Sequence, residues 1–173
     1  MAKFNKNTFY SKKQYYKLLP KLISFLNEDN PTHYLCIRLP IYAETDCIYK
    51  ALDILHPILL NLERKLCGSH WNRHHLRFRG VTELGTKHVC HFHIHLTAPN
   101  HTTEQIQEVC NDIIKLRKMP SHAMLVQDIN RTPERLAGYN TKEIYVDNYN
   151  NFESLRIFTS NELFNIPYKQ PKE

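Results

Sequence analysis

The chain has 173 residues, of which 42% are hydrophobic, and carries a formal net charge of +6 at pH 7. This length fits one domain with a sizeable core, so we expect a single domain over residues 1–173. No apolar run is long enough for a transmembrane helix, and the basic first residues are not followed by the apolar core of a secretory signal. These features favour a soluble cytoplasmic protein over one that spans or binds a membrane.

The positive charge favours a polyanionic partner such as nucleic acid. Part of it lies in residues 70–79, "HWNRHHLRFR", which contain three arginines, three histidines and no acid. Trp71 and Phe78 lie between these cations, and such a mixture can grip phosphates and stack bases. The five cysteines include no C-x-x-C pair, which favours reduced thiols over a disulfide framework.

Apolar periodicity and turn residues predict the elements in chain order. We expect a helix at 10–27 that Pro20 breaks or kinks, a strand at 33–39, a long amphipathic helix at 45–67, a strand at 73–83, a turn at Gly85, a strand at 88–97, a helix opened by a capping box of Thr102 and Gln105, a strand at 122–129, a helix from Pro133 toward Tyr145 and a short element at 155–164. The fold class is therefore α+β, with a mainly antiparallel sheet of four to five strands and helices on one face.

The stretch Cys90–Thr97, "CHFHIHLT", alternates apolar residues with histidines. Because successive strand side chains point to opposite faces, His91, His93 and His95 share one face and the apolar residues form the core face. The neighbouring strands add further side chains to this polar face: Arg77, Arg79 and Glu83, provided that no bulge occurs near Gly80, and Tyr34, Cys36 and Arg38.

Two histidines at positions i and i+2 of a strand direct their imidazoles toward one point. An acid from the hairpin partner would complete a three-ligand metal site, so the spacing favours metal binding over an ordinary solvated face. His95 could supply a fourth ligand, which leaves a closed structural site as an alternative.

Farther along, "LAGYNTKE" places Tyr139 and Lys142 three residues apart, which on a helix puts both side chains on one face. Alone, such a pair is a weak signal. An acid, then His-x-His on a strand, then Tyr-x-x-Lys on a late helix together resemble the HUH endonuclease superfamily. The nearest likeness is to rolling-circle replication initiators (Rep proteins) of small plasmids and filamentous phages and prophages.

The resemblance covers about residues 34–145 and implies an RRM-like sheet. It also implies that Glu83, eight residues before His91 in "ELGTKHVCHFH", joins His91 and His93 as a metal ligand. Tyr139 and Lys142 then form the tyrosine motif. His95 is an imidazole beyond this ligand set and could join the metal shell.

The activity implied by the resemblance is metal-dependent nicking and joining of single-stranded DNA through a 5′-phosphotyrosine. The expected cofactor is Mn²⁺ or Mg²⁺, with Zn²⁺ as a third candidate. The expected partner is single-stranded DNA at a replication origin, with helicase and polymerase from a bacterial host. Arg38, Arg77 and Arg79 are expected to hold the DNA backbone.

Other functions stay open from the sequence. A nucleic-acid-binding protein on the same fold would bind without cleaving, and a zinc-dependent hydrolase would act without Tyr139. A transposase or relaxase of the single-tyrosine class would share the chemistry but not the replication role. A covalent protein–DNA adduct separates the tyrosine nucleases from the first two.

Overall fold

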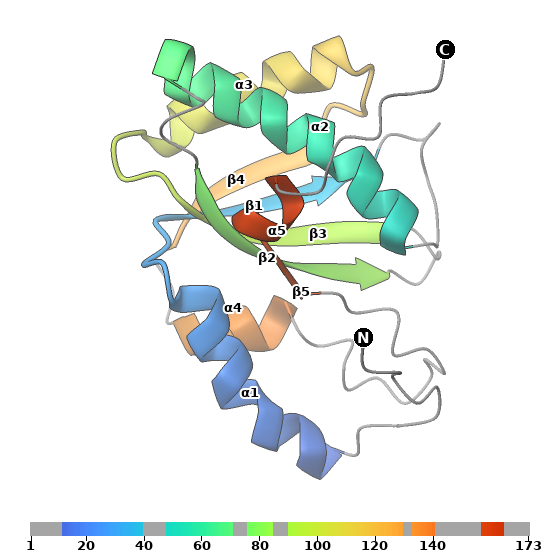
Figure 1. Ribbon diagram of the computed structural model, residues 1–173, viewed down its shortest axis with the longest axis vertical. Helices are drawn as coiled ribbons and strands as arrows, with labels where there is room; N and C mark the ends of the chain where they lie inside the picture. Colours follow the sequence, from blue (N-terminus) through green and yellow to red (C-terminus); the bar gives the residue numbers. More distant parts are fainter. Residues whose placement is uncertain are drawn as a thin grey trace.

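The computed structural model of the protein describes residues 12–39, 48–70, 76–84, 90–129, 133–140 and 157–164. Five strands form one antiparallel sheet in the order β4-β1-β3-β2-β5 (Figure 1). The strands are β1 (His33–Arg38), β2 (Arg77–Leu84), β3 (Cys90–Thr97), β4 (Met124–Asp128) and β5 (Ile157–Thr159). The helices are α1 (Lys12–Asn27), α2 (Ile48–Cys67), the 3₁₀ turn η2 (Gly68–His70), α3 (Thr103–Leu116), α4 (Pro133–Asn140) and α5 (Ser160–Phe164). The predicted α+β class with an antiparallel sheet is confirmed.

One face of the sheet is the apolar core, which α2 and α3 cover (Figure 1). Alternate residues of β1 and β3 supply its sheet side, among them Ile37, Phe92 and Ile94, and all of them are buried. Thr102 and Gln105 form the predicted capping box at the start of α3, in which Thr102 N donates to Gln105 Oε1 over 2.9 Å. This cap fixes the start of α3, and the helix places Ile106 and Ile113 in the core.

The opposite face of the sheet carries α1 and α4, which lie next to each other (Figure 1). Leu26 of α1 packs on Val81 of β2, and both side chains are buried. Because Val81 alternates with the core residues of β2, this contact puts α1 on the polar side of the sheet. The sheet is therefore covered on both faces, by α2 and α3 on one and by α1 and α4 on the other, and not on one face alone as the sequence suggested.

The predicted hairpin is confirmed, because β2 and β3 are antiparallel neighbours. Residues 77–84 pair continuously with residues 97–90, with Glu83 directly opposite His91 and no bulge at Gly80. Of the two effects expected of Pro20, a break and a kink, the break does not occur, because α1 is helical on both sides of this residue. The expected turn at Gly85 and the helix beyond Asn140 lie outside the described residues. Within the described ranges, no helix has both the length and the apolar composition needed to cross a membrane.

Candidate metal and nucleophile site

The polar face of the sheet brings most of the predicted site residues together. The register places Cys36 of β1 and Val81 of β2 on either side of His93, in the middle of the central strand. Burial distinguishes this face from a solvated sheet surface, since Glu83 is 5%, His93 5% and His95 1% exposed. Buried polar groups need partners, so the contacts among these side chains decide what the site can do.

A hydrogen-bonded chain of three side chains runs across the face. Glu83 Oε2 contacts Nε2 of His93, and the other ring nitrogen, Nδ1, contacts the hydroxyl of Tyr34. The rings of Tyr34 and His93 are nearly parallel, with an interplanar angle of 10° and centroids 6.0 Å apart. The imidazole of His93 is therefore held at both nitrogens, by a carboxylate on β2 and a phenol on β1.

The pKa values of His93 and His95 are shifted in opposite directions. Burial disfavours charge on His93, but hydrogen bonds with Cys36 and Glu83 outweigh it and raise the pKa of His93 to about 9. Burial lowers the pKa of His95 to about 4, and the neighbouring charge on His93 adds to this shift. At neutral pH His93 is an imidazolium paired with Glu83, while His95 is a neutral imidazole beside it.

Two of the three predicted metal ligands, Glu83 and His93, are in direct contact. His91 lies on the same face opposite Glu83, but among the described residues no three His, Cys, Asp or Glu side chains are grouped closely enough to hold an ion. The donor chemistry of one carboxylate and two imidazoles fits a divalent metal. His95 is buried next to this set and is neutral, as a fourth ligand must be.

Tyr139, the predicted nucleophile, lies on α4 over the same face. Its ring meets that of His93 edge to face, with centroids 6.4 Å apart and an interplanar angle of 85°. The Tyr139 side chain is 57% exposed, so the phenol lies beside the buried histidine and is also open to solvent. Lys142 lies outside the described residues.

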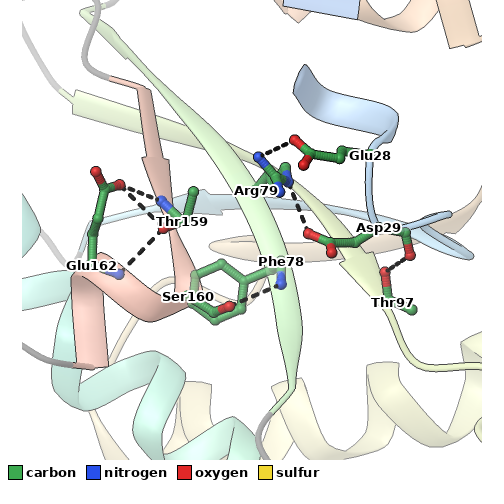
Figure 2. Close-up of polar contacts among 8 residues, drawn as sticks. All are labelled: Glu28, Asp29, Phe78, Arg79, Thr97, Thr159, Ser160 and Glu162. Atoms are coloured by element: carbon green, nitrogen blue, oxygen red, sulfur yellow. Dashed lines mark hydrogen bonds and ion pairs between the residues drawn. The ribbon is translucent and has the colours of Figure 1, made fainter. Parts of the chain in front are cut away.

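The three arginines expected to hold DNA have different surroundings. Arg77 is exposed and Arg38 is half-buried. Arg79 binds two carboxylates of this chain, with Nη1 2.9 Å from Glu28 Oε2 and Nε 2.8 Å from Asp29 Oδ2 (Figure 2). Its guanidinium also lies 4.8 Å from the centroid of the Phe25 ring. Arg79 therefore ties the C-terminal end of α1 to β2.

Sequence reasoning placed Tyr34 and Cys36 on the polar face but gave neither a role. The contact of Tyr34 with His93 depends on β1 being the neighbour of β3, and the order of strands in a sheet is not fixed by their order in the chain. The alternation of polar and apolar residues in β1 was the sequence signal that could have assigned Tyr34 to the site. It would have done so once β1 was paired with β3.

No protein-family model, curated protein or solved structure matches this chain. The function is therefore inferred from the contacts on the polar face.

Proposed function

We propose that this protein nicks and rejoins single-stranded DNA, with Tyr139 as the nucleophile and a divalent metal ion held by Glu83, His91 and His93. The observation that carries the proposal is the contact between Tyr139 and His93. It joins a solvent-exposed phenol on α4 to a buried carboxylate–imidazole pair on the central hairpin. Each motif alone is common, but their meeting at one point of the sheet is a specific arrangement.

The side chains that would hold the ion are chemically suited to it. Carboxylate and imidazole ligands suit Mn²⁺ and tolerate Mg²⁺, and His95 is the neighbouring donor that could enlarge the set. When bound, a divalent ion supplies charge that polarises a phosphate and offsets the negative charge developing on its oxygens. The protein would determine where the ion binds, because strand pairing fixes the positions of Glu83 on β2 and His93 on β3.

The nucleophile needs this help, since an unperturbed tyrosine is only about 0.1% ionised at neutral pH. In the proposed step, Oη of Tyr139 attacks the scissile phosphorus. A bond from Oη to phosphorus forms, the bond from phosphorus to O3′ breaks, and the phenol proton is balanced by protonation of the departing 3′ oxygen. The products are a 5′-phosphotyrosine and a free 3′-hydroxyl, which can prime synthesis or reverse the reaction. Lys142 is proposed to stabilise charge on the phosphate or the phenolate.

The test is a covalent adduct. A pool of single-stranded DNA molecules of varied sequence, each labelled at its 3′ end, is incubated with the protein and Mn²⁺. The products are then separated on a denaturing gel. The expected result is a labelled band at the mass of protein plus DNA that disappears with chelator and in Tyr139→Phe. Tyr49→Phe changes an exposed tyrosine of α2 in the same way and should leave the band unchanged. An adduct that survives in Tyr139→Phe would assign the nucleophile to another residue.

A nucleic-acid-binding protein that does not cleave is the second candidate. The burial of Glu83 and His93 favours it, because a buried carboxylate–imidazolium pair can serve stability alone. In this case the DNA would bind with the same affinity with and without Mn²⁺, and no adduct would form. Binding measured on the same DNA pool in chelator and in Mn²⁺ therefore separates the two functions.

A further inference from the structure

Tyr34 is a buried phenol whose hydroxyl contacts Nδ1 of His93. The side chain is 7% exposed and lies on β1, the strand next to β3 on the side away from Glu83. Two rings restrict it, since it lies parallel to His93 and meets His95 edge to face with centroids 6.2 Å apart. This packing limits where the Tyr34 hydroxyl can point.

A histidine that binds a metal ion uses one ring nitrogen without a proton, and its other nitrogen normally donates to a neighbouring acceptor. In His93 the nitrogen that faces Glu83 is Nε2. Nε2 is therefore the nitrogen available to an ion shared with Glu83. The proton must then remain on Nδ1, where the Tyr34 oxygen is in hydrogen-bond contact.

We propose that Tyr34 is a positioning residue that accepts a hydrogen bond from Nδ1 of His93, and so fixes the tautomer and the ring orientation with which His93 binds the metal ion. This inference rests on the metal site of the proposed function. It does not depend on the identity of the nucleophile or of the DNA.

Besides Glu83 and Tyr34, Cys36 also hydrogen-bonds with His93, which it faces directly in the register. A thiol sulfur is a weak acceptor, whereas a phenol oxygen is a strong one. We therefore assign the orienting role to Tyr34, and Cys36→Ala should change metal affinity less than Tyr34→Phe does.

Tyr34→Phe removes the oxygen and keeps the ring, so it tests the hydrogen bond with little change in packing. Calorimetric titration with Mn²⁺ should show affinity weakened about 10- to 100-fold, the range typical of lost outer-shell partners of metal ligands. Tyr49→Phe is the matched control and should bind Mn²⁺ like the wild type. Because Tyr34 does not touch DNA in this proposal, saturating Mn²⁺ should restore the cleavage rate of Tyr34→Phe.

A second measurement needs no variant. Long-range ¹H–¹⁵N spectra of the wild type, loaded with diamagnetic Zn²⁺, report which nitrogen of His93 carries the proton. The proposal requires a proton on Nδ1 and none on Nε2. A proton on Nε2 would overturn it, and so would wild-type Mn²⁺ affinity in a folded Tyr34→Phe protein.

Failure of this inference and failure of the nuclease can be told apart. If Tyr34→Phe weakens Mn²⁺ binding but the wild type forms no DNA adduct, the positioning role is supported and the proposed nicking activity is contradicted. If the adduct forms and Tyr34→Phe binds Mn²⁺ normally, the nuclease activity is supported and the positioning role of Tyr34 is contradicted. A wild-type protein that binds no Mn²⁺ removes the metal site and the Tyr34 role together.

Discussion

Arg79 of β2 and Asp29, in the turn after α1, are joined by a hydrogen bond of 2.8 Å from the Arg79 Nε to Asp29 Oδ2 (Figure 2). The same turn is tied to β3, because Thr97 Oγ1 donates to the backbone oxygen of Asp29 over 2.8 Å. Since α1 packs beside α4, this connection helps to place the helix that carries Tyr139. The guanidinium that we predicted as a DNA contact is therefore engaged within the chain.

The first prediction is that Arg79→Gln lowers the free energy of unfolding by about 1 kcal/mol, a modest value because the ion pairs are partly exposed. Arg77→Gln, two residues earlier on the same strand, should have little effect because Arg77 is exposed. Urea denaturation of both variants measures the difference. Equal stabilities for the two variants would mean that the Arg79 ion pairs contribute nothing measurable.

The second prediction concerns Arg77 and phosphate. If Arg77 contacts the DNA backbone, Arg77→Ala should weaken single-stranded DNA binding and lower the slope of log affinity against log salt by roughly 0.7. Arg79→Ala should leave that slope unchanged, because its charge is already neutralised by Glu28 and Asp29. Binding isotherms at several salt concentrations test both variants. A slope that falls in Arg79→Ala instead would mean that DNA displaces the two carboxylates.

The third prediction is that Glu83→Gln destabilises the metal-free protein and abolishes Mn²⁺ binding. Removing one partner of a buried ion pair leaves the other charge uncompensated, at a cost on the order of 3 kcal/mol. Urea denaturation in chelator measures the first effect and calorimetry the second. Glu108→Gln changes an exposed carboxylate of α3 and serves as the control. Unchanged Mn²⁺ affinity in Glu83→Gln would remove this residue from the ligand set.

The sequence predicts the two faces of the central hairpin well because its alternation decides which side chains lie together. A shift of one residue would turn the histidines of β3 into the core and expose Phe92 and Ile94, so the pattern determines which face is buried. The capping box of α3 is equally local, since Thr102 and Gln105 are three residues apart. Such short-range features can be recognised without the tertiary structure.

The packing of α1 and α4 on the polar face could not be predicted in this way. The apolar residues of α1 indicate that one side of this helix is buried, but they do not indicate on which face of the sheet the helix packs. The partner of Arg79 is 50 residues away in the chain, and the partner of Tyr34 is 59 residues away. Both contacts follow from the order of strands and helices in space, which alternation within one strand does not determine.

The fourth prediction is a loss of stability below neutral pH that depends on His33. Burial lowers the pKa of His33, although Asp128 opposes the shift, with Nε2 3.6 Å from Asp128 Oδ1. The unfolded chain therefore binds a proton more readily than the folded one. Stability from this group is complete above the unfolded pKa of about 6.5 and is lost as pH falls from there toward the lower folded value.

Urea denaturation of the wild type and of His33→Asn at pH 7.5 and 5.5 tests this dependence. The asparagine amide can replace the ring nitrogen that contacts Thr32, and it does not titrate. The wild type should lose more stability between the two pH values than His33→Asn does. His122→Asn, which changes an exposed histidine, should behave like the wild type. Equal pH dependence in all three proteins would exclude His33 as the source.

The last prediction concerns Gly80, where the strand is regularly paired with β3 and is covered by an aromatic ring. Gly80 is paired with Phe158 of β5, and a Cβ added at Gly80 would lie 2.2 Å from Cζ of that ring. Phe158 cannot move aside freely, because its ring also packs on Phe78 and Phe92, with centroids 6.4 and 6.2 Å away.

Gly80→Ala should therefore destabilise the protein by about 1–3 kcal/mol, the usual cost of overpacking a core. In a Phe158→Leu background the same substitution should cost less, because the smaller side chain leaves room for the methyl group. The coupling energy from this double-mutant cycle isolates the clash from the general effect of alanine in a strand. Gly138→Ala in α4 is the control, since no atom lies within 4 Å of its added Cβ, and it should leave stability unchanged or raise it. Equal costs of Gly80→Ala in both backgrounds would show that Phe158 is not the reason for glycine at this position, and the strand would then need glycine for its backbone alone.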